Sequence, residues 1–313
     1  MFKKAKQFDF LAHRKVYYII CAALIVVMIG GGLIRGYNTG IDFKGGTIAE
    51  IDTKKEVAIS DVEKVLSDCD IDGSVTHAGE GNVHIIIKTT DSLENETREK
   101  LVDALTEKFS LDDDAVVSIE NIGPTVGNLL KKGAAKAVAV AVILMLIYVA
   151  IRFQWKYGVA AIIALANTLL ILFGFYGIFG IEINSPFIAA MLTILGYGIN
   201  DTIVIFDRIR ENVGNSSKKS VSGMAPLVNL SIHQTVFRSV MTSLTTLLVM
   251  IPMLIICGST IRSFILPLLV GVITSTLSSI FVATSVWYDI NKASDRDSYG
   301  KKAKKKAANK QAA

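Results

Sequence analysis

Long apolar segments dominate the pattern of hydrophobic and polar positions along this chain. A helix needs about 20 mostly apolar residues to cross a lipid bilayer. Six segments of roughly that length carry few or no charges, at residues 16–34, 134–151, 157–178, 186–206, 236–256 and 264–288. Because lipid offers no hydrogen-bond partner to the backbone, each segment must satisfy its own amide groups as a helix. The pattern predicts a membrane protein with a bundle of six transmembrane helices.

The stretch between the first two apolar segments has the pattern of a small folded domain. Alternating positions bounded by turn residues predict strands at residues 47–52, 74–77, 83–88 and 115–120. Ser60-Asp61-Val62-Glu63 has the pattern of a capping box that starts one helix, and a second, amphipathic helix is predicted over 94–109. The resulting order, βαββαβ, predicts a ferredoxin-like α+β fold.

Lysine and arginine residues predict the side of the membrane that each loop faces, because loops rich in these residues stay in the cytoplasm. They gather in both tails and in two of the inter-span loops: Lys3, Lys4, Lys6, Arg14, Lys15, Arg152, Lys156, Arg208, Arg210, Lys218, Lys219, Lys301, Lys302, Lys304, Lys305 and Lys306. We therefore expect both termini in the cytoplasm. The chain then divides into a cytoplasmic tail with the first helix (1–37), an extracytoplasmic α+β domain (38–130), a five-helix bundle (131–290) and a basic cytoplasmic tail (291–313).

Composition agrees with a membrane protein, since 51% of the 313 residues are hydrophobic. The first span has a basic flank but no small-x-small cleavage pattern, so we interpret it as an uncleaved anchor. The basic tail is expected to contact anionic lipid headgroups rather than nucleic acid. Cys21, Cys69 and Cys257 have no spacing typical of a disulfide or a metal site, and no cofactor is expected.

Asp201 lies inside the fourth predicted span, and Arg238 lies near the start of the fifth. An ionised side chain at bilayer depth costs at least ~2.5–3.5 kcal/mol, so it normally faces water or a partner. One interpretation is an ion pair that only holds two helices together. The other is a proton-coupling site, because burial favours the neutral carboxyl group and a nearby guanidinium favours the carboxylate. Movement of the arginine would then load or release a proton.

Polar and small neighbours accompany both charges. Thr193, Gly196 and Asn200 form a small polar face beside Asp201, and Gln234, Arg238, Thr242 and Thr245 share one face of span five. We assign proton coupling to Asp201 and Arg238, supported by Asn200, Thr202 and Gln234.

Other polar residues are weaker candidates. His233 titrates near neutrality and lies at the boundary of span five. We expect Glu182 to be solvated, and Asp207, next to Arg208 and Arg210 at the membrane edge, to form surface pairs. Ser275, Ser278 and Ser279 are expected to form a packing face.

Glycine-containing segments bracket the α+β domain. Gly45-Gly46 precedes it and Gly123-Pro124 follows it. Ordinary linker turns explain such residues equally well. Their location between bundle and domain also makes them candidate hinges.

Several motifs together resemble the SecF family of protein-export membrane subunits. They are Gly40-Ile41-Asp42-Phe43-Lys44-Gly45-Gly46, Gly123-Pro124, Tyr148 with Arg152-Phe153, and the long run from Gly196-Tyr197-Gly198-Ile199-Asn200-Asp201-Thr202 to Arg210-Glu211-Asn212. The resemblance covers nearly all of the chain up to the basic tail.

The resemblance implies a member of the resistance-nodulation-division superfamily in the bacterial plasma membrane, a transport subunit rather than an enzyme. Such a subunit pairs with SecD and assists the SecYEG translocon, with YidC and YajC as further partners and unfolded exported polypeptides as cargo. It uses the proton gradient to complete secretion on the outer side. The intramembrane aspartate of the family falls on Asp201 and its span-five arginine on Arg238.

Two departures from the family pattern bear on this mechanism. Many relatives have His-Asp in span three where this chain has Asn167-Thr168. Neither residue can carry a proton as those can, so span three of this chain lacks the residues for such a relay. Gly198 stands where serine is common, which removes a hydroxyl group near Asp201.

Three other functions compete with this prediction. An intramembrane aspartyl protease needs two carboxylates that share a proton, and no other span contains an acid. An exporter of small molecules or lipids from the same superfamily usually carries both halves in one chain. A passive scaffold for the translocon would leave Asp201 and Arg238 inert.

Overall fold

Six apolar helices form the bundle of this protein, for which we describe a computed structural model. The structure describes residues 8–292 apart from 92, 94, 113–114 and 216–220. Among these residues, six helices are long and apolar enough to span a membrane, as predicted. They are α1 (Arg14–Arg35), α5 (Pro124–Arg152), α6 (Trp155–Phe179), α7 (Ser185–Gly214), α8 (Val221–Ile256) and α9 (Ser259–Leu277), the last continuing through a π-helical turn, η2 (Ser278–Ala283), to Lys292.

Much of the basic sequence that predicts the topology lies outside the described residues. This applies to Lys3, Lys4, Lys6, Lys218, Lys219 and the lysines at 301–306. The structure therefore describes only part of the charge pattern on which the predicted orientation depends.

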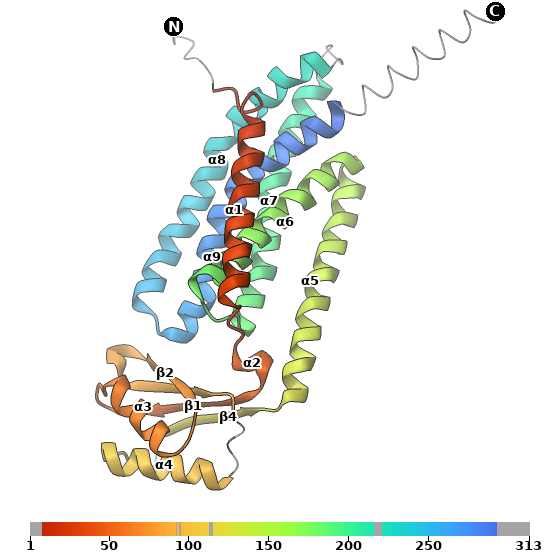
Figure 1. Ribbon diagram of the computed structural model, residues 1–313. Coiled ribbons are helices and arrows are strands. Elements are labelled where there is room, and N and C mark those ends of the chain that lie inside the picture. The colour runs from red at the N-terminus through yellow and green to blue at the C-terminus, as the bar shows by residue number, and fades with distance from the viewer. Residues whose placement is uncertain (1–7, 92, 94, 113–114, 216–220, 293–313) are drawn as a thin grey trace, which may run out of the picture.

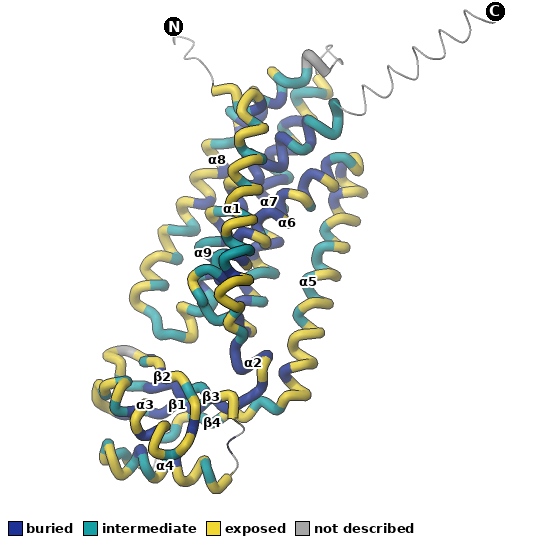
Figure 2. Tube along the Cα trace, in the orientation of Figure 1, coloured by how far each residue is buried: buried dark blue, intermediate teal, exposed yellow. Residues whose placement is uncertain are grey.

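The helices divide into an interior group and a peripheral group. About 56% and 61% of the most apolar windows of α6 and α9 are buried, against 6% for α1 and α5 and 11% for α8. The exposed residues of the peripheral helices are largely apolar, which suits contact with lipid. α5 stands apart from the other helices along much of its length (Figures 1 and 2).

A four-stranded antiparallel sheet lies at the end of the bundle opposite the start of α1 (Figure 1). The elements follow the predicted βαββαβ order: β1 (Gly46–Asp52), α3 (Ile59–Asp68), β2 (Gly73–Ala78), β3 (His84–Thr89), α4 (Asn95–Phe109) and β4 (Val116–Ile122), with a short 3₁₀ turn, η1 (Glu80–Asn82), in the β2–β3 hairpin. The spatial order is β2-β3-β1-β4, and all neighbouring pairs are antiparallel.

The two faces of the sheet have different partners because side chains alternate along each strand. Ile51, Ile85 and Ile87 are buried against α3 and α4, where Leu101 and Leu105 complete the core. The opposite face is turned toward the bundle. There it lines a cleft of about 610 Å³ with the first turns of α7 and α9.

The predicted capping box at Ser60 is wrong. α3 begins at Ile59 after Ala58, and no side chain caps it. Val57 and Ile59 pack against the core of the sheet, which fixes where the chain enters the helix, and Ser60 points to solvent inside the first turn. Burial of these two apolar side chains outweighs the capping preference.

The core of the sheet supports a test of independent folding. A fragment of residues 46–122 should unfold cooperatively, because it holds its own buried cluster. Leu105, fully buried, should cost about 2–5 kcal/mol of unfolding free energy when replaced by alanine. Val117 is 51% exposed, and Val117→Ala should change that free energy by less than about 0.5 kcal/mol. Urea unfolding followed by circular dichroism measures both, and equal effects would contradict this assignment of the core.

Candidate functional site

Asp201 lies in the interior of the bundle, in the middle of α7. The helix begins after Asn184, whose side-chain oxygen accepts a hydrogen bond from the amide of Phe187 at 3.1 Å, and it runs unbroken past Asp201. Asp201 is 9% exposed, and the hydroxyl-bearing side chains of Ser239 on α8 and Ser279 in η2 face its carboxyl group. Oδ2 of Asp201 and Oγ of Ser239 have no hydrogen-bond partner among the described residues. A buried polar atom without a partner is costly, so this carboxyl group has unused capacity for a proton or a water molecule.

Hydroxyl groups from η2 continue this polar centre toward two other helices. Oγ1 of Thr202 lies 2.8 Å from Oγ of Ser279 and donates to the carbonyl oxygen of Gly198 at 2.9 Å. Nδ2 of Asn167, on α6, donates to Oγ of Ser278 at 2.8 Å. Ser275, Ser278 and Ser279 are all buried, as expected of a packing face, and Ser278 and Ser279 also take part in hydrogen bonds between helices.

The π-helical turn explains how two adjacent serines reach different helices. One extra residue per turn widens the helix locally and re-aims its side chains, and such turns are frequent at functional sites. Here Ser278 bonds to α6 while Ser279 bonds to α7. The turn thus joins three helices through two consecutive residues.

A third group of hydroxyls joins α7, α8 and α9. The hydroxyl of Tyr197 lies 3.0 Å from Oγ of Ser243, which lies 2.5 Å from Oγ1 of Thr276. Thr235, Ser239 and Ser243 are all buried and occur at intervals of four, so one stripe of α8 faces the interior. The four-residue spacing of these hydroxyls is visible in the sequence, but it does not by itself show which polar stripe of α8 is buried.

Arg238 does not lie beside Asp201. It is exposed, and among the ion pairs of the described residues none joins it to Asp201. Gln234 is exposed as well, and its Oε1 accepts hydrogen bonds from Nε of Arg208 at 2.6 Å and Nδ2 of Asn212 at 2.9 Å. Asn200 is exposed on α7, so of the predicted supporting residues the structure brings only Thr202 to the polar centre.

A pocket of about 450 Å³ holds Arg238 and Gln234 instead. Val204 and Thr235 form its wall toward the polar centre, and Asp207, Arg208 and Glu211 are the charged residues that complete it. Val204 follows Asp201 by three residues and Thr235 precedes Ser239 by four, each about one helical turn. The pocket therefore approaches Asp201 from the end of the bundle where α7 ends.

The weaker candidates have specific partners. A ring nitrogen of His233 lies 2.8 Å from the carbonyl oxygen of Phe8, so the histidine fixes the start of the described chain onto α8. Asp207 forms a surface pair with Arg210 at 3.0 Å, as predicted, and the neighbouring Arg208 pairs with Glu211.

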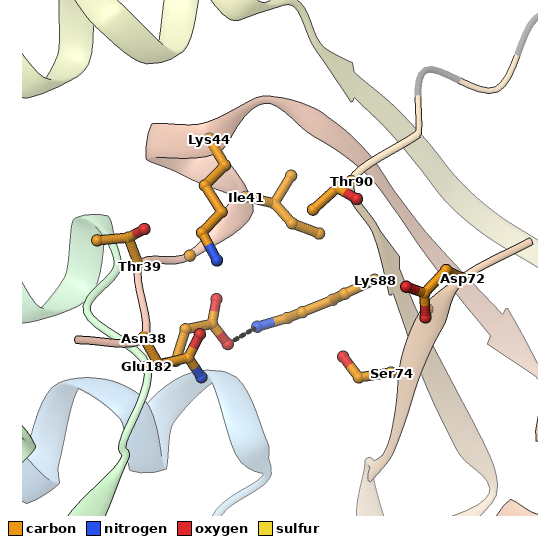
Figure 3. A pocket seen from close by; sticks show the side chains of 11 residues that line it. Asn38, Thr39, Ile41, Lys44, Asp72, Ser74, Lys88, Thr90 and Glu182 are labelled. Atoms are coloured by element: carbon orange, nitrogen blue, oxygen red, sulfur yellow. Dashed lines mark hydrogen bonds and ion pairs between the residues drawn. The ribbon is translucent and has the colours of Figure 1, made fainter. Parts of the chain in front are cut away.

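Glu182 is not simply solvated as expected. Its carboxylate lies 2.7 Å from Nζ of Lys88, which extends from β3 toward it (Figure 3). The pair lines a pocket of about 270 Å³ between the sheet and the loop that joins α6 to α7. It is a direct ionic contact between the sheet and the bundle.

The segment before the predicted hinge is fastened to the bundle. The amide of Gly40 donates to the carbonyl of Ile183 at 2.8 Å, and the amide of Ser185 donates to Oδ2 of Asp42 at 2.6 Å. In α2 (Ile41–Lys44), Phe43 is buried in a core cluster with residues of α6, α7 and α9. Any bending between bundle and sheet must therefore occur after residue 44.

The candidate hinge residues meet at one point. Gly45 and Gly46 have φ values of +86° and +137°, which only glycine adopts without strain. A Cβ atom on Gly45 would lie 3.0 Å from the carbonyl oxygen of Ile122 and 3.2 Å from the nitrogen of Pro124. Gly123 precedes Pro124 at the start of α5 and has an ordinary φ of −63°. The two connections to the sheet thus lie against each other.

Comparison with known proteins covers most of the chain. The family model described as "Protein export membrane protein SecD/SecF, C-terminal" matches residues 101–293. The protein translocase subunit SecF of Sebaldella termitidis is 38% identical over 280 residues, which are 88% of this chain and 89% of that one. This chain belongs to the SecF family.

SecF sequence also matches part of longer proteins. The protein translocase subunit SecDF of Bacillus subtilis is 35% identical over 90% of this chain, but the match covers only 38% of that protein. The crystal structure of SecDF from Thermus thermophilus, described as a translocon-associated membrane protein, superposes with a TM-score of 0.80 at 34% identity. That match covers 93% of this chain and 40% of that one. This SecF chain thus spans about two fifths of the SecDF proteins it matches.

Both departures from the common SecF pattern have structural counterparts in this chain. Asn167 cannot carry a proton, but its bond to Ser278 keeps α6 connected to the polar centre. A Cβ atom on Gly198 would lie 2.5 Å from Oγ of Ser275, so a hydroxyl from α9 occupies the space beside Gly198.

The contrast between the hinge glycines can be tested by alanine substitution. Gly46→Ala should destabilise the sheet, because a Cβ atom would overlap the carbonyl oxygen of Thr89 at a strained φ. Gly123→Ala should have little effect, because no atom lies within 4 Å of its Cβ position and its φ suits any residue. Thermal unfolding of the two purified variants, monitored by circular dichroism, checks this order. Equal loss of stability would contradict it.

Proposed function

We propose that this SecF chain uses the proton gradient to assist polypeptide export, with Asp201 as the group that binds and releases the proton. The observation that carries the proposal is the buried carboxyl group of Asp201, with an unpaired oxygen, among hydroxyl groups from three helices. A group that must exist in two protonation states needs neighbours that serve both. Hydroxyls meet this need because each can donate or accept a hydrogen bond.

Competition for hydroxyl protons supports a link between protonation and helix position. A hydroxyl has one proton to donate. If Asp201 is ionised, it attracts the hydroxyl protons of Ser239 and Ser279. Ser279 then has no proton left for Thr202 or for the carbonyl of Gly198, both of which lie within its reach. Protonation of Asp201 reverses this choice, so the hydrogen bonds between α7 and η2 differ in the two states.

Two helices extend from this centre to the sheet. The first turns of α7 and α9 line the cleft between the sheet and the bundle through Pro186, Ser259 and Arg262. A shift of either helix would alter the side of this cleft that the bundle forms. In this proposal the sheet and its two helices are a ferredoxin-like domain outside the membrane, and they move about Gly45, Gly46, Gly123 and Pro124.

The energy available is sufficient for such a change. One charge that crosses a potential of 100 mV is worth about 2.3 kcal/mol, which shifts a two-state equilibrium about fifty-fold. The pocket that contains Arg238 and Gln234 supports a role for these residues in passing protons between Asp201 and the cytoplasm. Asn200 and Thr202 complete the proposed proton-coupling set.

The partners of the relatives complete the proposal. The names SecF and SecDF support association of this chain with SecD and the SecYEG translocon. We extend this to YidC, YajC, membrane lipids and unfolded exported polypeptides. In this arrangement the protein is a multi-pass bacterial plasma-membrane subunit with both termini in the cytoplasm.

Asp201→Asn tests the proton-carrier role. The substitution keeps the size of the side chain but removes its ionisation, so the protein should fold and export should lose its dependence on the proton gradient. Asp103→Asn is the control, because Asp103 is an exposed acid on α4, outside the polar centre and the pocket of Arg238. Export by strains with equal protein levels is measured with and without an uncoupler. Normal, uncoupler-sensitive export by the Asp201→Asn strain would exclude Asp201 as the proton carrier.

Cysteine labelling tests the orientation. Glu99 on α4 and Asn215 at the end of α7 are exposed, and they lie at opposite ends of the molecule. In a chain whose Cys21, Cys69 and Cys257 are replaced by alanine, Glu99→Cys should react with an impermeant maleimide in intact cells. Asn215→Cys should react only after the membrane is opened. The opposite pattern would reverse the proposed topology.

A further inference from the structure

Two arginines share one aromatic ring where α5 ends and α6 begins. The guanidinium carbon of Arg152 lies 5.2 Å from the centroid of the Phe153 ring, and that of Arg210, from α7, lies at the same distance of 5.2 Å. Phe153 is 6% exposed and belongs to the core of the bundle. Because the ring is fixed, cation–π attraction holds both flexible side chains at the same place.

The two guanidinium groups have more hydrogen-bonding capacity than their partners use. Among the described residues, Asp207 is the only charged partner of either, at 3.0 Å from Arg210 and 4.0 Å from Arg152. Each guanidinium offers five N–H donors in a planar fork that matches phosphate. The side chains are 46% and 49% exposed, so the remaining donors are accessible. Two positive charges share one carboxylate, which leaves the cluster with a net positive charge.

An apolar surface leads directly to this cluster. Leu144, Ile147, Tyr148 and Ile151 follow the spacing of one helical face of α5, and their exposed fractions are 60%, 48%, 53% and 82%. Trp155, the first residue of α6, is 63% exposed just beyond Arg152. Tryptophan is typical of the boundary between lipid tails and headgroups. The apolar face therefore ends, at the depth of the headgroups, beside the two arginines.

We propose that Arg152 and Arg210 bind the phosphate group of an anionic glycerophospholipid whose acyl chains lie along this face of α5. The first turn of α6 adds the positive end of a helix dipole at the same place. A lipid satisfies both halves of the surface, because its phosphate meets the guanidinium groups and its chains cover the apolar stripe. An acidic protein segment would pair with the arginines but would leave the stripe uncovered. This site is separate from the polar centre at Asp201.

Fluorescence quenching by brominated lipids tests the proposal. The full chain is reconstituted in phosphatidylcholine vesicles that contain either brominated phosphatidylglycerol or brominated phosphatidylcholine in equal amounts. The chain has two tryptophans, and Trp287 is 3% exposed, so Trp155 is the responsive reporter. Brominated phosphatidylglycerol should quench more strongly. The preference should fall about fivefold for each arginine replaced by glutamine, as expected for one basic residue near a membrane surface.

Control variants distinguish lipid binding at Arg152 and Arg210 from general attraction of anionic lipids to positive charge. Lys15 is exposed at the start of α1, and Lys15→Gln should keep the preference for phosphatidylglycerol. Phe153→Leu retains both positive charges but removes the shared ring, so it should lower the preference. It also provides a test if Arg152→Gln/Arg210→Gln does not fold. An unchanged preference in the Phe153→Leu variant would mean that charge alone attracts the lipid, which would overturn the site.

Two further results would overturn the proposal. If inorganic phosphate abolishes the preference and sodium chloride of equal ionic strength does not, the arginines take free phosphate rather than a lipid headgroup. If the double arginine variant keeps the full preference, no lipid phosphate is bound here. Loss of a co-purifying protein from that variant would then assign the surface to an acidic protein segment.

Discussion

Burial of a carboxyl group inside an apolar helix bundle imposes the arrangement found around Asp201. Such a group needs polar neighbours, yet bulky polar side chains would push the helices apart. Serine and threonine answer both demands, because they are small and each carries a donor and an acceptor. The residues that meet at Asp201 are therefore Thr202, Ser239 and Ser279. Because Gly198 has no side chain, the hydroxyl group of Ser275 can also pack against α7 beside it. The π-helical turn follows from the same demand, since it lets adjacent serines serve two different helices.

The sequence predicted the elements of the fold better than their contacts. Apolar runs identify the six spans because the bilayer makes any other backbone conformation too costly. Alternation along the outer segment likewise identified all four strands, and helical spacing identified α4. The first helix, α3, was predicted, but with Ser60 as its capping residue, which is wrong. The start of α5 was harder to predict from the sequence. Its first turns, from Pro124, are exposed and of mixed polarity, so hydropathy assigned residues 124–130 to the neighbouring domain.

Of the predicted site residues, the structure places Asp201 and Thr202 at the buried polar centre and leaves Asn200, Gln234 and Arg238 exposed. Asp201 stands out because a lone acid in a span is rare. On α8, however, the charge of Arg238 drew attention to the face that holds Gln234 and Thr242, which is exposed. The buried face is one residue further round the helix, at Ser239 and Ser243. Periodicity alone cannot choose between two adjacent polar stripes, since that choice depends on how α8 packs against α7 and α9. The π-helical turn has no signature in the sequence either.

The contact between Gly45 and the Ile122–Pro124 segment has a geometric consequence for the outer domain. A body joined to its support at two distant points can only stretch or shear, whereas a body joined at one point swings. The chain enters and leaves the sheet at one point, and the longest strands, of seven residues, reach about 23 Å away from it. In the proposed hinge motion, a slide of α5 past α2 would rotate the whole sheet, and the displacement would grow with distance from this point. The sheet would then act as a lever about this point. The Lys88–Glu182 ion pair ties the sheet to the bundle close to the fulcrum, since Lys88 is next to Thr89, whose carbonyl oxygen lies against Gly46.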